Sequence, residues 1–149
     1  LPVNLYGPRY NFNPESSHVI PALIKKVHDA KKSKAQSITC WGTRSASREF
    51  LYVDDAARGI VQATQLYDEG EPVNLGAGRE ITIRDLTNTI VNLMGYRGQI
   101  EWDTSKPDGQ PRRCLDVSKA KEKFGFTSTT TLEDGLRKTI DWFVEKNRK

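Results

Sequence analysis

Residues 1–26, LPVNLYGPRYNFNPESSHVIPALIKK, place a strand, a turn and a helix start in immediate succession. Apolar and polar side chains alternate over residues 1–6, which predicts a strand. The Gly-Pro pair at 7–8 ends this strand, and a polar loop over 9–17 leads to a helix that begins near His18. In α/β proteins, ligands bind beyond the carboxyl ends of the strands, so this junction predicts a binding crevice.

The helix after the loop has apolar residues at helical spacing. They are Ile20, Leu23, Ile24 and Val27. Ser16 or Ser17 is expected to cap the helix. His18 lies at the helix entrance and off the apolar stripe, where a histidine is ordinarily a capping or surface residue. Residues 29–36 are rich in Lys, Ser and Gln and predict a surface connection.

The rest of the chain continues to alternate strands with helices. Further strands are predicted over residues 37–41, 48–53, 73–75 and 100–103, and helices are predicted to start at Asp54, Thr82, Ser118 and Thr131. The inner face of the helix from Asp54 is expected to contain Ala57, Ile60, Val61 and Thr64. The order of the elements predicts an α/β fold, and a chain of 149 residues can form one domain-sized unit.

Composition and charge exclude several classes of protein. With 36% hydrophobic and 28% charged residues, and no apolar run near 18 residues, the chain reads as globular, with no membrane span and no signal peptide. Cys40 and Cys114 have no metal-ligand spacing and are expected to be free, buried thiols of a reducing compartment. A net charge of +4 could suit nucleic acid, but the basic residues are scattered, and a nucleotide diphosphate satisfies the same charge.

Three further motifs are relevant to binding. The loop over 104–113 has two prolines, a glycine and three cations, which indicates a lid over an anionic ligand. Gly76-x-Gly78 lacks the third glycine of a dinucleotide loop and is predicted to be a turn. Asp54 and Asp55 suit the start of a helix, and no metal site is predicted there.

These stretches resemble the extended short-chain dehydrogenase/reductase family of NAD-dependent epimerases and dehydratases. Within that family they are most similar to the GDP-L-fucose synthase branch. The matching pieces are PVNLYGP (2–8), NFNPESSHVIPALIKK (11–26), WGT (41–43), REFLYVDD (48–55), VNLGAG (73–78) and SKPDGQPRRCLDV (105–117).

The resemblance implies a substrate-binding lobe plus the last strands of a Rossmann-type parallel sheet. No Gly-x-x-Gly-x-x-Gly loop and no Tyr-x-x-x-Lys pair occur in the chain, and both lie upstream of PxNLYGP in the family. Residues 1–149 are therefore expected to be a single segment from the C-terminal part of a longer enzyme, without its N-terminal nucleotide-binding part. The family resemblance further implies a cytoplasmic homodimer formed mainly through that missing part.

The branch epimerises a GDP-4-keto-6-deoxymannose substrate at C3 and C5 and then reduces C4 with NADPH. The resemblance implies that His18 is catalytic and works with an upstream cysteine, since histidine exchanges protons near neutral pH. It implies cofactor contacts to NADP from Pro2, Val3, Asn4, Leu5 and His18, and substrate contacts from Lys26, Trp41, Arg48 and Lys106. Lys26 stands where the family has an arginine fork, which weakens the match there.

Two alternatives stay open. Another NDP-sugar epimerase, dehydratase or reductase with the same lobe would look similar, and the upstream catalytic residues would discriminate it. A non-catalytic basic module binding nucleic acid or another protein would instead show a steep salt dependence of its affinity for DNA or RNA. The sequence does not determine the sugar, the preference for NADP over NAD, or the oligomeric state.

Overall fold

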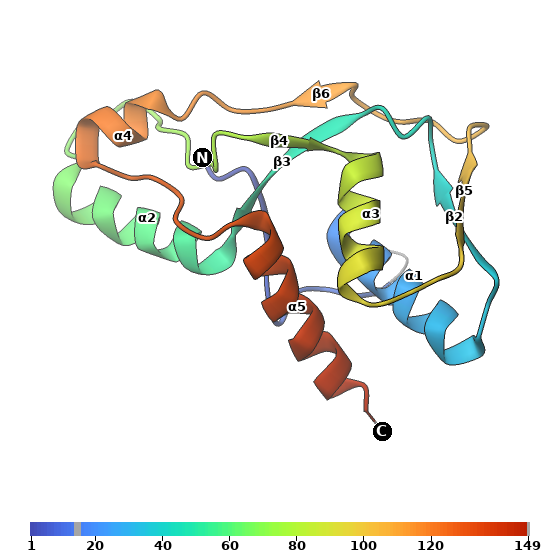
Figure 1. Ribbon diagram of the computed structural model, residues 1–149. Coiled ribbons are helices and arrows are strands. Elements are labelled where there is room, and N and C mark those ends of the chain that lie inside the picture. Colours follow the sequence, from blue (N-terminus) through green and yellow to red (C-terminus); the bar gives the residue numbers. More distant parts are fainter. Residues whose placement is uncertain (14–15, 149) are drawn as a thin grey trace.

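Strands and helices alternate along the chain, as Figure 1 shows. The structure is a computed structural model that describes residues 1–13 and 16–148, so Pro14 and Glu15 of the predicted polar loop and Lys149 lie outside the described residues. The elements are β1 (Asn4–Tyr6), α1 (Val19–Ser33), β2 (Ser37–Trp41), β3 (Ser47–Tyr52), α2 (Val53–Leu66), β4 (Glu80–Thr82), α3 (Ile83–Leu93), β5 (Gln99–Asp103), β6 (Arg112–Arg113), α4 (Ser118–Phe124) and α5 (Leu132–Lys146).

The strands form two small sheets. In the first, β1 is an edge strand that pairs with β3 in parallel, with Asn4 opposite Phe50. The other half of β3 pairs antiparallel with β4 and parallel with β6. The second sheet is the parallel pair β2–β5. The predicted α/β class with parallel strands is confirmed.

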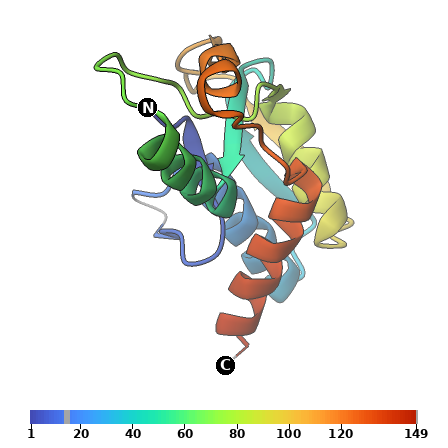
Figure 2. The ribbon, with the colours of Figure 1, turned by 90° about the vertical axis from the view of Figure 1, so that its left-hand side faces the viewer.

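Three helices cover the larger core. Helix α3 contacts both α1 and α5, and the three lie together in Figures 1 and 2. Ile24 of α1, Leu86 of α3 and Leu136 of α5 are fully buried in this core. The predicted caps of α3 and α5 are confirmed: Thr82 and Thr131 each accept a hydrogen bond from the backbone N–H three residues later, at 3.0 and 3.1 Å.

The start of α1 differs from the prediction. Its N-cap is His18, whose side chain makes no capping hydrogen bond. The hydroxyl of Ser16 instead accepts a hydrogen bond from the side-chain amide of Asn11 at 3.0 Å. The Ser17 hydroxyl is buried. The prediction that Ser16 or Ser17 caps the helix is therefore wrong, because the Ser16 hydroxyl bonds to Asn11 and the Ser17 hydroxyl accepts no bond from the helix backbone.

Helix α1 is also longer than predicted. It continues to Ser33 instead of giving way to a surface connection over 29–36. Within it, Lys25 Nζ and a carboxylate oxygen of Asp29 form an i, i+4 ion pair at 2.6 Å, which suits a helix surface. The helix ends at Lys34, which adopts a left-handed conformation with φ of 57°.

A second apolar cluster lies between α2, α4 and the first strands. It contains Val3, Leu51, Leu75 and Phe126. Gly59 of α2 permits the contact with this cluster, since a Cβ at that position would lie 2.8 Å from the Phe126 ring. This cluster anchors one face of α2 against the sheet.

The face of α2 predicted to be inner is in fact exposed. Ala57, Ile60, Val61 and Thr64 face outward, and the buried residues are Asp55, Ala56 and Gly59. The polar contacts of Asp55 fix this rotation of the helix, since its carboxylate has to face the segment that precedes α5.

Asp55 is a buried carboxylate that ties α2 to the segment before α5. It accepts hydrogen bonds from Arg58 at 2.7 Å, from the backbone N–H of Thr130 at 2.9 Å and from the hydroxyl of Thr129 at 3.0 Å. Burial raises its pKa, but these donors stabilise the carboxylate more strongly and hold the pKa well below the usual range. The interpretation of this acidic pair as a helix start rather than a metal site is consistent with these contacts.

Candidate functional site

Three segments that are distant in sequence meet where β2 ends and β3 begins. Trp41 is the last residue of β2, Arg48 is the second residue of β3, and Lys106 follows β5. Trp41 is 68% exposed, and Lys106 Nζ lies 5.7 Å from the centre of its ring. Lys106 therefore lies over an exposed indole, and Arg48 contacts the same loop two residues further on, at Asp108.

The guanidinium of Arg48 is half-buried below the loop that contains Lys106. It donates hydrogen bonds to the backbone oxygens of Ser47, at 2.7 Å, and of Asp108, at 3.3 Å. A guanidinium has five N–H donors, and both acceptors are uncharged carbonyls. These contacts therefore leave the positive charge of Arg48 without a counter-charge, so the guanidinium can bind an anion.

A cavity of about 650 Å³ opens beside Trp41, between α1 and β2. Its residues are Ser17, Val19, Ala22, Leu23, Lys25, Lys26, Asp29, Cys40, Trp41 and Ile83. Lys26 Nζ donates a hydrogen bond to the backbone oxygen of Thr39, which directs the lysine side chain along β2. The Ser17 hydroxyl is buried and has no hydrogen-bond partner among the described residues. A largely apolar cavity with few polar groups is typical of a small-molecule site.

His18 lies at the N-terminal end of α1, where it is the N-cap residue. Its side chain is exposed, and the edge of its ring packs against Tyr10 at 5.8 Å between ring centres. Eight residues separate it from Lys26, which corresponds to about 12 Å along a helix axis. The imidazole is therefore accessible from solvent, but it is not among the residues that line the cavity beside Trp41.

Residues 2–5 span the start of the edge strand β1 and the two residues before it. Val3 is buried, and its backbone N–H donates to the oxygen of Leu75 at 2.9 Å. The side-chain amide of Asn4 donates to the backbone oxygen of Glu49 at 3.1 Å, so it is engaged within the sheet. Because β1 is an edge strand, one side of its backbone faces away from β3. Pro2 and Leu5 complete this edge segment.

The lid-like loop between β5 and β6 is fixed at its far end. Arg112 and Arg113 form β6, which pairs with β3. Arg112 Nε also forms an ion pair with Glu80 at 2.9 Å. Arg112 thus ties β6 to β4, whereas Arg113 has no ion pair within the described residues.

Both cysteines are free thiols, as predicted, with Cys40 buried and Cys114 half-buried. Burial raises the pKa of Cys40, and burial together with the nearby Glu49 carboxylate raises that of Cys114. Both side chains are therefore protonated at neutral pH and are poor nucleophiles. The position of Cys40 in the wall of the cavity was not predicted.

Comparisons with known proteins identify the family of this chain. Residues 1–76 match the NAD dependent epimerase/dehydratase family. The chain belongs to this family. It is 46% identical over 145 residues to a probable GDP-L-fucose synthase 1 of Oryza sativa subsp. japonica, which covers 97% of this chain and 44% of that protein. It is 42% identical over 154 residues to the GDP-L-fucose synthase of Escherichia coli K12, covering 97% of this chain and 48% of that protein.

A solved structure of the epimerase/dehydratase type is similar throughout. It is a GDP-L-fucose synthetase from Naegleria fowleri bound to NADP, 31% identical to this chain, with a TM-score of 0.92 over 99% of this chain and 46% of that one. The chain thus spans less than half the length of the curated relatives described above. The predicted Rossmann-type fold class is confirmed by this likeness.

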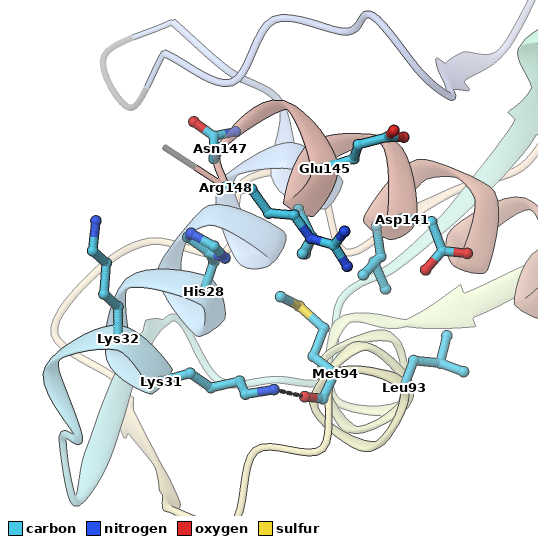
Figure 3. A pocket seen from close by; sticks show the side chains of 11 residues that line it. His28, Lys31, Lys32, Leu93, Met94, Asp141, Glu145, Asn147 and Arg148 are labelled. Atoms are coloured by element: carbon cyan, nitrogen blue, oxygen red, sulfur yellow. Dashed lines mark hydrogen bonds between the residues drawn. The ribbon is translucent and has the colours of Figure 1, made fainter.

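A second cavity of this epimerase/dehydratase chain, about 860 Å³, lies between α1, α3 and α5 and is shown in Figure 3. Lys31, Lys32 and Arg148 line it together with Asp141 and Glu145. Lys31 Nζ donates to the backbone oxygen of Met94, as the dashed line in Figure 3 shows. Its charges are of both signs, and it contains none of the predicted site residues.

Sequence reasoning missed the polar residues that hold the site together. Thr43 and Asp108 are joined by hydrogen bonds and lie inside the motifs WGT and SKPDG, yet neither was singled out. Their pairing across 65 positions could not be read from spacing.

Among the described residues, no helix is long and apolar enough to cross a membrane.

Proposed function

We propose that this chain is the substrate-binding part of a GDP-L-fucose synthase, which converts GDP-4-keto-6-deoxy-D-mannose to GDP-L-fucose with NADPH. The observation that carries the proposal is the grouping of Trp41, Arg48 and Lys106 from three separate segments, in a chain similar over nearly its whole length to proteins of that name. Together they offer two cations and an aromatic face, which suit a nucleotide diphosphate.

The substrate roles follow from the chemistry of each side chain. The half-buried guanidinium of Arg48 binds the diphosphate, because its free N–H groups form a planar fork. Lys106 adds a mobile cation, and the exposed ring of Trp41 stacks on a planar or apolar part of the substrate. Lys26, whose ammonium lies on the rim of the cavity, contacts the same ligand as a point charge.

His18 is proposed to exchange protons with the sugar. Carbons C3 and C5 flank the C4 ketone, so a base can remove their protons and leave an enolate. Inversion needs a proton to return from the opposite face of the ring, and therefore needs a second group. Cys40 and Cys114 do not fit that role, because the Cys40 thiol is buried in the apolar core and the Cys114 thiol contacts the backbone oxygen of Leu115 instead of facing His18. The second group is proposed to come from another part of the enzyme.

The chain's residues fit only one end of NADP. The edge strand β1 and the residues directly before it offer backbone groups, those of residues 1–3 being already bonded in part to Leu75, and His18 is an exposed polar side chain beyond that strand's following loop. These suit the nicotinamide end, whereas the chain has no glycine-rich loop for the phosphates. When bound, NADPH supplies the hydride that reduces C4.

The remaining part of the enzyme is proposed to pack against α2. Ile60, Val61 and Leu66 on that helix are 53%, 55% and 63% exposed, and the adjacent β1 is an edge strand. Exposed apolar groups beside an unpaired strand edge are typical of an interface. A nucleotide-binding part of the same polypeptide would cover both features and extend the parallel sheet. A homodimer formed through that part, and a cytoplasmic location, stay predictions.

A charge placed on this face tests the proposed contact. Ile60→Asp in the natural full-length protein is expected to lower the free energy of unfolding by about 3 kcal/mol, because it buries a carboxylate in an apolar interface. Asn88→Asp, at an exposed position of α3 outside this face, is the matched control and should change it by less than about 0.5 kcal/mol. Chemical denaturation provides the measurement, and equal small effects of both substitutions would contradict the proposed contact.

Nucleotide selectivity separates the proposed function from its alternatives. The natural full-length protein is expected to bind GDP at least about tenfold more tightly than UDP or dTDP in titration calorimetry, a difference of about 1.4 kcal/mol. Preference for UDP or dTDP would favour another NDP-sugar enzyme of the family. Tight, steeply salt-dependent binding of DNA or RNA without nucleotide selectivity would instead favour the non-catalytic module.

A further inference from the structure

The carboxylate of Asp108 joins the lid-like loop to the turn after β2. Its Oδ1 accepts a hydrogen bond from the backbone N–H of Thr43 at 2.6 Å, and its Oδ2 accepts one from the Thr43 hydroxyl. The Thr43 hydroxyl also lies 2.8 Å from that of Ser45. One side chain of the loop is thus held at two points by a single residue of the opposite turn.

The backbone on both sides is shaped for this contact. Gly42 has a φ of 93°, and a Cβ at that position would overlap Oδ1 of Asp108. Gly109, directly after the aspartate, has a φ of 71°. Both conformations favour glycine over other residues, so a glycine next to each partner allows the close approach.

The contact continues the register of the neighbouring strands. Strands β2 and β5 pair in parallel up to Trp41 and Asp103, and they lie side by side in Figure 1. A turn closed by the N–H of Lys106 on the oxygen of Asp103, at 3.3 Å, then shifts the loop. After this shift Lys106 faces Trp41 and Asp108 binds Thr43. The two pairs therefore have the same register between the loop and the turn after β2.

The same residue also contacts Arg48, but through its backbone. The guanidinium donates to the carbonyl oxygen of Asp108 at 3.3 Å, whereas the carboxylate is directed to Thr43. The negative charge of Asp108 is therefore stabilised by the Thr43 donors rather than by Arg48. The contact with the backbone oxygen holds the guanidinium of Arg48 in place but does not give it a negatively charged partner.

We infer that Asp108 is a positioning residue for sugar-nucleotide binding. By fastening the loop over 104–111 to the turn after β2, it holds Lys106 and Arg48 around Trp41 before the ligand arrives. This inference rests on the proposed function. Because the loop is ordered in advance, the ligand does not have to order it, and binding is tighter.

The test compares Asp108→Ala with wild type in the natural full-length protein. Loss of the Asp108–Thr43 contact is expected to raise the Kd for GDP and the KM for the GDP-sugar about tenfold, while kcat changes less than twofold. The reason is that the ligand must then order the loop, and the lost conformational entropy opposes binding. Thr43→Val removes the hydroxyl and one of the two hydrogen bonds, and it is expected to have a smaller effect than Asp108→Ala. Thr43→Ser keeps the hydroxyl and should have wild-type Kd and KM. Asp116→Ala is the matched control, since the carboxylate of Asp116 accepts hydrogen bonds from the backbone N–H and hydroxyl of Ser118, beyond the loop.

Hydrogen exchange provides a second readout that needs no ligand. The Thr43 amide is expected to lose protection in Asp108→Ala and to keep it in Asp116→Ala. A purely structural role would lower the amount of active enzyme, and hence apparent kcat, without moving KM. Unchanged Kd and KM in Asp108→Ala would overturn this inference alone, whereas failure of wild-type protein to bind GDP would overturn the proposed function with it.

Discussion

Replacing His18 by Gln in the natural full-length protein is expected to slow epimerisation at C3 and C5 by about 10²- to 10⁴-fold, the usual contribution of one acid–base group. Glutamine keeps much of the side-chain volume and polarity but cannot exchange a proton. The proposal gives this imidazole a role in proton exchange and none in delivering the hydride to C4, so reduction of the unepimerised sugar should persist. The measurement is product identification by nuclear magnetic resonance, together with the rate of NADPH oxidation.

His28→Gln is the matched control for this experiment. His28 lies on the same helix, but its ring packs edge-on against Phe143 at 5.3 Å, away from the cluster around Trp41. The control enzyme should form the epimerised product at a rate close to wild type. Equal losses in both variants would indicate damage to α1 rather than loss of a catalytic group, and normal epimerisation in His18→Gln would remove the role from His18.

Replacing Glu49 by Ala is expected to lower the free energy of unfolding by about 4 kcal/mol, because it leaves buried donors without acceptors. Glu49 is fully buried in β3. Its Oε1 accepts the N–H of Gly78 at 2.8 Å, and its Oε2 accepts the N–H of Leu115 at 2.7 Å. The side chain therefore joins β3 to the turn after residue 75 and to the segment that follows the lid-like loop.

The conservative variant Glu49→Gln should lose less stability than Glu49→Ala, since the amide oxygen still accepts one of the two bonds. Glu101→Ala, at an exposed position of β5, is the matched control and should change stability by less than about 0.5 kcal/mol. Urea denaturation followed by circular dichroism gives the comparison. A loss for Glu49→Ala no larger than that of Glu101→Ala would show that the buried carboxylate does not hold these segments together.

Much of the fold could be predicted from local patterns. The apolar stripe of α1, with Ile24 and Val27 fully buried, follows from helical periodicity. The caps at Thr82 and Thr131 follow from the hydrogen-bonding chemistry of a hydroxyl three residues before an acidic residue. In these places, local propensity and tertiary packing favour the same structure.

The orientation of α2 could not be predicted in this way. The periodicity of Ile60 and Val61 indicates an apolar face, but a pattern does not show whether that face packs within this chain. The contacts of Asp55 with residues 128–130 turn the helix the other way. Because these partners are more than 70 positions away in sequence, no window around α2 contains the information.

The candidate site shows the same division. Motif resemblance singled out Trp41, Arg48 and Lys106; in the structure Lys106 lies over Trp41, and Arg48 contacts the loop that contains Lys106. It did not single out Asp108, whose partner Thr43 lies 65 positions away. Side chains proposed to bind the ligand are visible in motifs, whereas the residues proposed to position them depend on contacts between loops.

The most direct test of the account is to run the reaction of the natural full-length protein with GDP-4-keto-6-deoxymannose and NADPH in deuterated water. Protons removed at carbons next to a ketone are replaced from solvent, so the account predicts GDP-L-fucose with deuterium at both C3 and C5. A reduced sugar without deuterium at C3 and C5 would contradict the epimerase assignment. No oxidation of NADPH with this sugar would contradict the proposed substrate.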